Sequence, residues 1–303
     1  MSRFIVAVPS ITPQRVSQNM ALYTQIAELG GEVVIIGNSH EFENIKSTNP
    51  KVHILTNGEN NGFAGSINLV ASWDDEWDWI LLLNDDVLID TKSLGKLQIA
   101  LANLDTDKWI VNCDPGLPRS IPNIKDVFMN LSLFEAVKRK LPNRNSTSEK
   151  PVASTTPNLL EKMPTESYAS FSITAISRGT WELIGSLDEE MPFCYEDADY
   201  TKRCFESKKV TSLRYTLEAT HDASSSTKSN INRVLPVVVY SALKYLEQGG
   251  VNKFAARSVS FAALLIRIPL ITLNSAPKGK HLQGIFESLK VILSGRRPKL
   301  PNY

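Results

Sequence analysis

The sequence is poor in cysteine and in net charge. Only three of its 303 residues are cysteines, Cys113, Cys194 and Cys204, and their spacing fits neither a metal site nor a redox motif. A sparse, odd number of cysteines suits a reducing compartment. The formal net charge of +1 argues against a protein that binds nucleic acid through its global charge.

Segments for crossing or entering a membrane are also lacking in the sequence. No uncharged apolar stretch reaches the ~18 residues that a transmembrane helix needs. The first residues, Met1-Ser2-Arg3, lead directly into a strand-like segment and do not resemble a signal peptide. We therefore expect a cytoplasmic protein.

The chain has enough apolar residues, 42%, for one large domain with or without an appendage. Its charge is unevenly distributed, because the segment from Val251 onward has a single acidic residue, Glu287, and nine basic ones. The basic residues are Lys253, Arg257, Arg267, Lys278, Lys280, Lys290, Arg296, Arg297 and Lys299. This segment is therefore near +8, and residues 1–250 are near −7 by difference.

The first hundred residues alternate apolar strands with helices. We expect helices over 14–29, ended by Gly30 and Gly31, and over 63–73. The expected strands are residues 3–8 (closed by Pro9), 32–36, 52–55 and 79–83. Continuous apolar strands between helices predict an α/β fold, in which helices cover both faces of a mostly parallel sheet.

The rest of the chain divides into a middle part and a helical end. Residues 142–166 are polar and lack periodicity, so we expect a mobile loop there. The expected elements after it are a strand at 168–177, a helix from Asp197, a strand at 210–217, and helices at 234–246, 252–273 (interrupted by Pro269) and 281–293 (ended by Gly295). We expect a catalytic domain at 1–228, with halves 1–112 and 113–228, and a basic helical region at 229–303.

An acidic turn follows the apolar segment 79–83. It places Asn84, Asp85 and Asp86 at the carboxyl end of a buried strand, where open α/β sheets bind ligands. One or two carboxylates there can hold a hard cation. Such a cation neutralises the charge of a diphosphate and stabilises it as a leaving group. We expect Asp86 to bind the metal directly, and Asp85 to contact the ribose or a metal-bound water. The alternative is a polar turn, with Asp90 capping the next helix.

A second carboxylate cluster lies at residues 193–199, where a helix is expected to begin. A carboxylate in a partly apolar cleft can act as general base and take the proton of an attacking hydroxyl. We assign this role to Asp197, with Glu196 as the second choice. The alternative is an acidic helix start, because the helix dipole favours carboxylates there and Asp199 can pair with Arg203.

Two further features fit a ligand site at this sheet edge. His221 follows a strand-like run, and its imidazole can complete a divalent metal site. Gly62 and Gly65 permit close approach of a ligand to the backbone at a helix start. Each feature has a structural alternative, an ordinary core or surface histidine and a glycine-containing loop that leads into a helix.

These segments, in this order, resemble the motifs of glycosyltransferase family 2. Residues 60–68 resemble its N-x-GFAGGxN segment, and residues 83–86 resemble the L-N-x-D variant of its metal-binding D-x-D motif. Residues 185–189 and 193–199 resemble G-x-F-D-E-x-F-F-x-Y-x-E-D-x-D, and His221 falls where the family often has a late histidine. The resemblance covers about residues 3–225 and is greatest to bacterial rhamnosyl- and galactofuranosyltransferases of surface polysaccharide synthesis.

The resemblance implies a GT-A fold, which is Rossmann-like, and an inverting displacement with Asp197 as base. It implies Mn or Mg at Asp86, His221 and Asp85, a UDP- or dTDP-sugar donor, and a saccharide or lipid-linked saccharide acceptor. At Gly37 the family usually has an acid that contacts the nucleotide base, so Asn38 is expected to make that contact instead. The donor-binding residues that we expect are Pro9, Ser10, Asn38, Asn61, Phe63, Ala64, Asn68, Asn84 and Asp85.

Two other functions and one partner are considered. A sugar nucleotidyltransferase needs a glycine-rich basic loop after its first strand, and residues 9–13 contain no glycine. A non-catalytic saccharide-binding or partner-binding module would not need the clusters at 84–86 and 196–197. The basic, partly apolar C-terminal helices favour a peripheral contact with the inner face of the cytoplasmic membrane. Their alternative is a helical appendage or a dimer interface.

Overall fold

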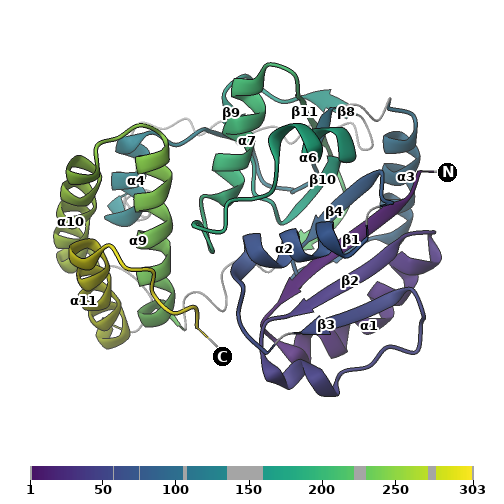
Figure 1. Cartoon of the computed structure of the whole chain (residues 1–303), viewed down its shortest axis with the longest axis horizontal. Coiled ribbons are helices and arrows are strands. Elements are labelled where there is room, and N and C mark those ends of the chain that lie inside the picture. The colour runs from purple at the N-terminus through teal and green to yellow at the C-terminus, as the bar shows by residue number, and fades with distance from the viewer. Residues whose placement is uncertain are drawn as a thin grey trace, which may run out of the picture.

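The structure, a computed structural model, describes residues 2–56, 58–74, 76–104, 108–134, 160–221, 230–271 and 278–301. In this part of the chain the centre is an eight-stranded sheet (Figure 1). Its order is β3 (Val52–Thr56), β2 (Glu32–Gly37), β1 (Phe4–Ser10), β4 (Trp79–Leu83), β10 (Ile173–Ser177), β6 (Trp109–Asn112), β11 (Thr211–Tyr215) and β8 (Leu160–Lys162). β10 and β8 run antiparallel to the other strands, which are parallel to one another.

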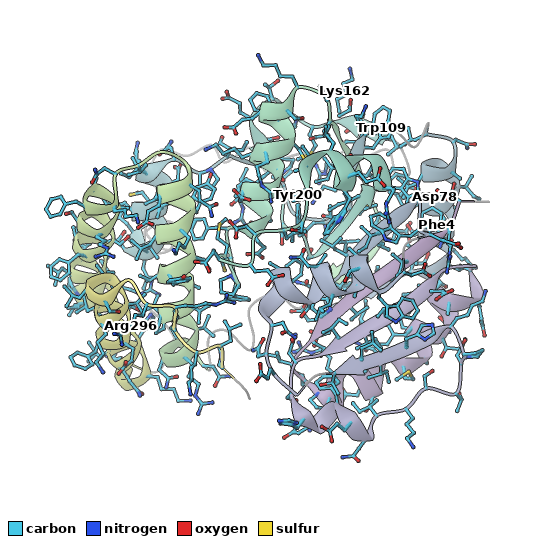
Figure 2. The ribbon with its side chains drawn as sticks, in the orientation of Figure 1. Phe4, Asp78, Trp109, Lys162, Tyr200 and Arg296 are labelled. Carbon is cyan, nitrogen blue, oxygen red and sulfur yellow. The ribbon has the colours of Figure 1, made fainter. Side chains whose placement is uncertain are left out.

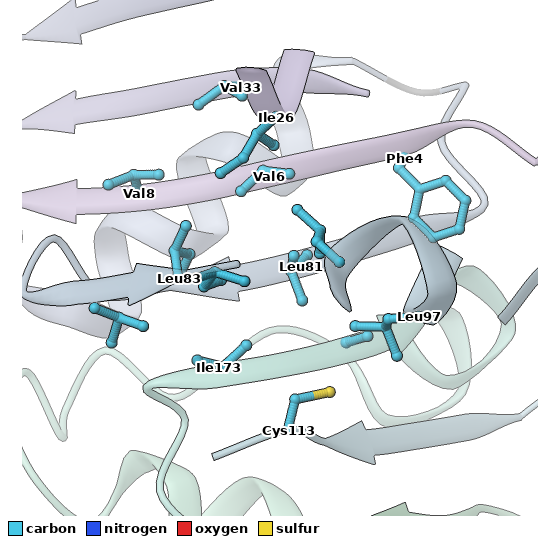
Figure 3. Packing of buried hydrophobic residues seen from close by; sticks show 14 of the residues in the cluster. Phe4, Val6, Val8, Ile26, Val33, Leu81, Leu83, Leu97, Cys113 and Ile173 are labelled. Carbon is cyan, nitrogen blue, oxygen red and sulfur yellow. The ribbon is translucent and has the colours of Figure 1, made fainter. Parts of the chain in front are cut away.

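Successive side chains of a strand point to opposite faces of the sheet. Because the strands are apolar on both faces, helices cover both. On β1, Val6 and Val8 join one apolar cluster (Figure 3), whereas Ile5 and Ala7 join another. Burying one such valine or isoleucine stabilises the fold by roughly 1.5–3 kcal/mol. The first cluster contains α1 (Pro13–Glu28) and α3 (Thr91–Ala102), and the second contains α2 (Gly62–Trp73), α6 (Arg178–Ile184) and α7 (Glu196–Ser207).

The C-terminal helices form a second layer, whose apolar cluster also includes Met191, Tyr195 and Ala198. These helices are α9 (Ile231–Gln248), α10 (Lys253–Leu270) and α11 (Lys278–Ser294), and α4 (Ile124–Leu131) packs among them (Figure 1). The buried Arg267 of α10 links three of these helices, because it donates to the carbonyl of Leu131 at 2.7 Å and to His281 at 3.2 Å. No helix among the described residues has the length and apolar character that a membrane span requires.

The predicted fold class, an α/β fold with a mostly parallel sheet and a C-terminal helical appendage, is confirmed. Three local expectations are wrong. β1 continues through Pro9 because β4 pairs with it only as far as Ala7, so the missing N–H of Pro9 is not needed there. The segment 168–177 is broken into β9 (Ser167–Tyr168) and β10, and α10 continues past Pro269 by one residue.

The expected loop at 142–166 is only partly tested. Residues 142–159 lie outside the described residues, whereas 160–162 form β8 at the edge of the sheet. The sequence analysis did not predict several short elements that flank the site. They are β5 (Val87–Ile89), β6, β7 (Arg119–Ser120), β12 (Ala219–His221), α4 and α6, whereas α3 is the helix that the alternative for the acidic turn placed after Asp90.

Candidate functional site

The turn after β4 places Asp85 in a buried, hydrogen-bonded position at the carboxyl edge of the sheet. The hydroxyl of Ser10, at the end of β1, donates to one of its oxygens, and Arg15 Nη1 of α1 donates to the other at 2.9 Å. Asn19 donates to the backbone carbonyl of Asp85 at 2.9 Å. Burial raises the pKa of Asp85, although the bonds from Ser10 and Arg15 oppose this shift. Asp85 therefore ties α1 and β1 to the turn.

Asp86 is half-buried and lies directly before the short strand β5, near the end of the short strand β12. β5 starts at Val87, directly after it, and pairs antiparallel with β12 so that His221 lies opposite Val87. This register places the backbone of His221 beside that of Asp86, although the two residues are 135 positions apart in the chain. The histidine and the carboxylate that the sequence analysis selected are thus brought to one edge.

The chemistry of these two residues fits a divalent cation. Carboxylate oxygen suits Mg²⁺ and Mn²⁺, and imidazole is a common additional ligand. Among the described residues no group of three or more His, Cys, Asp or Glu side chains is arranged to hold a metal ion by itself. A cation that bridges a carboxylate and the phosphates of a substrate does not need such a cage, because the phosphates supply the remaining ligands.

The second acidic cluster is placed by a strained backbone. Cys194 and Tyr195, directly before α7, have φ angles of 66° and 72°, in the left-handed region that bulky side chains avoid. The ring of Tyr195 packs against that of Tyr245 of α9, with centroids 5.3 Å apart. These two residues turn the chain so that Glu196 and Asp197 become the first residues of α7.

Glu196 and Asp197 share a region that disfavours negative charge. Burial raises the pKa of Asp197 to about 6, and the backbone N–H of Ala198 and the nearby Arg119 oppose the shift. Burial also raises the pKa of Glu196 well above its usual value, and the charge of Asp197 adds to this. Glu196 Oε2 is buried without a hydrogen-bond partner. Burial therefore disfavours the ionised form of both carboxylates, and the Ala198 N–H and Arg119 favour the ionised form of Asp197.

The start of β10 connects the two acidic clusters. The carbonyl of Ser172 accepts from the backbone N–H of Asn84 at 2.9 Å, and the hydroxyl of Ser172 donates to Asp114. Asp114 follows β6 and in turn raises the pKa of Asp197. Since β4 and β6 run in the same direction, the turn at 84–86 and the cluster at 196–197 adjoin the same edge of the sheet.

The sequence analysis missed Arg15, Asp114, Arg119 and Ser172. Asp114 had a usable signal, because it follows the apolar run 109–111 by a few residues, as Asp86 follows β4. Arg119 lies on β7, which pairs with β9 and so places it opposite Tyr168. Nothing in the local sequence around Arg15 and Ser172 indicates that they contact acids 70 and 58 residues away.

Residues 61–68 form the start of α2 and the connection to the second cluster. Gly62 has a φ of 73°, and a Cβ there would come within 2.5 Å of the carbonyl of Pro192. The N–H of Phe63 donates to that same carbonyl at 2.9 Å. Asn68 exchanges hydrogen bonds with the backbone of Leu187 at 2.9 and 3.0 Å. The glycine motif therefore docks α2 on the segment that leads to Glu196.

The remaining predicted donor residues lie around the ends of β1, β2 and β4. Asn38 is buried, donates to Ser66 at 2.9 Å and accepts from the N–H of Asn61 at 3.0 Å. Gly37 has no room for an acid, because a Cβ there would lie 2.2 Å from the ring of Phe42 in η1 (His40–Asn44). The half-buried residues are Pro9, Phe63 and Asn84. Ala64 of α2 is fully buried in the second apolar cluster.

No protein-family model and no curated protein matches the sequence. The chain is similar to the crystal structure of GalNAc-T7 with UDP, GalNAc and Mn²⁺, with 14% identity and a TM-score of 0.49 over 99% of this chain and 59% of that one. It is also similar to mannosyltransferase PcManGT from Pyrobaculum calidifontis with GDP-Man and Mn²⁺, with 11% identity and a TM-score of 0.47 over 97% of this chain and 87% of that one. A third similar structure is S. aureus TarS 1-349, with 10% identity and a TM-score of 0.40 over 96% of this chain and 83% of that one.

Proposed function

We propose that the protein is a metal-dependent, inverting glycosyltransferase that moves a hexose, such as rhamnose or galactofuranose, from a UDP- or dTDP-sugar to a saccharide acceptor. One observation carries this proposal. A carboxylate with a pKa of about 6, Asp197, and the acidic turn at 84–86 adjoin the same edge of a nucleotide-binding type of sheet. A proton acceptor and a diphosphate site are the two groups that such a transfer requires.

In the proposed reaction Asp197 acts on the acceptor. The acceptor hydroxyl attacks the anomeric carbon on the face opposite the nucleotide, and its proton passes to a carboxylate oxygen of Asp197. The new C–O bond forms as the bond between the anomeric carbon and the diphosphate breaks, and the nucleoside diphosphate leaves. A base with a pKa near the working pH is the most effective in this role. Burial and the charge of Asp197 raise the pKa of Glu196 well above its usual value, so Asp197 is the carboxylate that we assign as the base.

On the donor side, Asp86 and His221 would hold the cation. When bound, Mn²⁺ or Mg²⁺ supplies charge to stabilise the departing diphosphate. Asp85 positions Arg15, whose guanidinium lies at the same edge of the sheet. Asn38 and Asn61 stay hydrogen-bonded to each other at the ends of β2 and α2, where they shape the space for the nucleotide.

The observed contacts favour transfer over the two alternatives. In a sugar nucleotidyltransferase, the loop after β1 would have to bind a triphosphate. Here the hydroxyl of Ser10 is instead used to bind Asp85 and to accept from the N–H of Thr12 at 3.1 Å. A saccharide-binding module would have no need for an Asp197 whose pKa is held near 6.

Exposed apolar stripes on two C-terminal helices support peripheral contact with the inner face of the cytoplasmic membrane. Along α10 the stripe includes Phe254, which is 80% exposed, Phe261 and Leu265; along α11 it includes Phe286 and Leu293. Their spacing of four or seven residues puts each set on one face of its helix. Apolar residues beside an excess of basic ones fit an interfacial helix on an anionic leaflet.

A donor screen tests the proposed activity directly. UDP- and dTDP-sugars are incubated with the full chain and Mn²⁺, and the release of UDP or dTDP is measured with and without saccharide acceptors. The proposal expects metal-dependent release from at least one donor, and EDTA should abolish it. If no donor is hydrolysed or transferred, and neither UDP nor dTDP binds in the presence of Mn²⁺, the proposal is wrong.

A further inference from the structure

A basic groove lies between α9, α11 and the C-terminal tail that follows Gly295. Its volume is about 590 Å³. Figure 1 shows the tail leaving α11 and running along α9 toward the sheet domain, and Figure 2 shows Arg296 near its beginning. The lining residues are Asn232, Arg233 and Pro236 of α9, Gln283, Glu287, Lys290, Val291 and Ser294 of α11, and residues 296–301 of the tail.

The charge of this groove is strongly one-sided. Five of its lining side chains are basic and exposed, whereas Glu287 is its single acid and pairs with Lys290 at 2.9 Å. The basic residues are Arg233, Lys290, Arg296, Arg297 and Lys299. Concentrating these charges around one hollow costs electrostatic repulsion, which a bound anion relieves. Guanidinium groups match phosphate oxygens in geometry as well as in charge.

The groove adjoins both segments of the candidate active site. At one end, the carbonyl of Pro301 accepts from the side chain of Asn60 at 2.8 Å, directly before the donor-side segment 61–68. At the other end, hydrogen bonds from Tyr240 and Lys244 lower the pKa of Glu190, and the nearby charge of Arg297 adds to this shift. Glu190 belongs to the segment that leads to Glu196, and Tyr240 of α9 donates to it at 2.6 Å. The tail that lines the groove therefore borders the segments that lead to 61–68 and to 196–197.

The lining residues also indicate which class of anion fits. None of the described residues that line the groove is aromatic, so they do not form the stacking platforms with which proteins bind single-stranded nucleic acid. Its floor includes the buried Pro236 and Val291, and its walls are cationic. A small, highly charged phosphate or diphosphate group suits this combination better than a polymer of bases.

We propose that this groove binds the phosphate or diphosphate of the acceptor, so that the acceptor is a phosphate-linked saccharide rather than a neutral sugar. The identification of the ligand as an acceptor rests on the proposed transferase function, whereas the anion site itself does not. In this arrangement the groove holds the charged end of the acceptor while its sugar hydroxyl reaches Asp197. The recognised chemistry is a phosphate dianion or diphosphate, whether it belongs to a soluble or a lipid-linked saccharide.

The anion site is tested by isothermal titration of the full chain with inorganic pyrophosphate, in EDTA and without nucleotide. A groove variant, R296Q/R297Q/K299Q, is compared with a control, K51Q/K92Q/K96Q, which removes the same charge from exposed lysines of the sheet domain. We expect the groove variant to bind pyrophosphate ~10-fold more weakly or worse, since several charge-assisted bonds are lost. The control should bind like the wild type. Equal affinities in all three proteins would overturn the proposal.

A second arm separates a soluble phosphate from a lipid headgroup. The same three proteins are sedimented with vesicles of phosphatidylglycerol and phosphatidylcholine, and the proposal expects equal vesicle binding. A groove variant that loses vesicle binding assigns the groove to membrane lipids and overturns the acceptor proposal. Since the titration needs neither metal nor donor, a failed donor screen leaves the anion site standing and removes only its assignment to an acceptor.

Discussion

Glu196 and Asp197 are neighbours in the chain, yet their surroundings favour different protonation states. If Glu196 is neutral, then Glu196→Gln changes little charge and should retain most of the transfer rate. Asp197→Asn should keep donor binding and lose ~10²–10⁴-fold in turnover, the usual contribution of a general base. Turnover and Mn-dependent nucleotide affinity of both variants, measured at neutral pH, check this. A larger loss in the Gln variant would transfer the role of base to Glu196.

The pKa of Asp197 also predicts how the rate depends on pH. The base works when deprotonated, so kcat/KM should rise as pH increases through about 6. Asp114 raises this pKa and Arg119 lowers it. Asp114→Asn should therefore shift the midpoint of the profile to lower pH, and Arg119→Gln should shift it to higher pH. Shifts of the same sign, or none, would show that another group controls the profile.

Asp86 carries the prediction for the metal. Asp86→Ala should abolish the part of UDP or dTDP binding that depends on Mn²⁺, because we propose this carboxylate as the ligand that the chain contributes at the turn. A thermal-shift titration with and without Mn²⁺ measures this. The control is Glu76→Gln, a carboxylate that is 84% exposed near the opposite end of β4. If Asp86→Ala keeps the affinity of the wild type, Asp86 is not the ligand.

At the scale of elements, α4, α10 and α11 are held together by a buried pair of bases. Nε2 of His281 accepts from Arg267, and burial lowers the pKa of His281 to about 4, with the charge of Arg267 contributing. The folded protein thus binds this proton less readily than the unfolded chain, whose histidine titrates near 6.5. The resulting stability is complete above about 6.5 and is lost as pH falls towards about 4.

This linkage gives a prediction for unfolding. His281→Gln keeps an acceptor for Arg267 but cannot take up a proton, so its free energy of unfolding should fall less than that of the wild type between pH 7 and pH 4.5. Denaturant unfolding at the two pH values measures this change in the free energy of unfolding for each protein. The contribution of the carboxylates is the same in both proteins and cancels in the comparison. Parallel losses in the two proteins would show that His281 titrates normally in the fold.

The elements that could be predicted from sequence are those whose burial leaves a long pattern. Residues 79–83 are apolar throughout and form β4 with those bounds, and Gly30, with a φ of 101°, ends α1 as expected. β5 and β12 have three residues each, too few for a period to appear. Other signals were present but unused, such as the capping box of Asn123 and Asp126 that starts α4.

Asp90 shows how a functional and a structural interpretation can both apply to one stretch. Its side chain accepts from the N–H of Ser93 at 2.7 Å and caps α3, as the structural alternative for residues 84–90 stated. This cap does not compete with a ligand role for Asp86, because it lies four residues further along. Local patterns identified which polar residues lie at the sheet edge, but they did not predict which residues these contact.

At the scale of the whole molecule, the candidate site depends on contacts that no local pattern encodes. Asp85 binds Ser10 and Arg15 because β1 and β4 are neighbours in the sheet, and Asp114 reaches the site because β10 is inserted between β4 and β6. The antiparallel direction of β10 could not be derived from its sequence. The resemblance of the motifs to a known family anticipated the meeting of the two acidic clusters, whereas periodicity alone did not.

The two layers of the molecule also differ in what they expose, and this gives the last prediction. We propose that residues 1–228 form the catalytic domain and that residues 229–303 place it on the membrane. The triple variant F254S/F261S/L265S removes the apolar stripe of α10, whose side chains are 80%, 39% and 47% exposed, without opening the core. It should lose most of its sedimentation with anionic liposomes, because apolar burial supplies part of the binding energy and the basic residues of α10 and α11 supply the rest.

The matched control removes equally exposed apolar side chains from the sheet domain. L69S/L88S/I99S changes residues that are 44%, 53% and 65% exposed and should sediment with liposomes as the wild type does. Raising the salt concentration should weaken wild-type binding, since exposed charges separated by more than a Debye length are screened. If the α10 variant and the control bind liposomes equally, the stripe has another occupant. A change in oligomeric state of the α10 variant alone would then identify that occupant as a second copy of the chain.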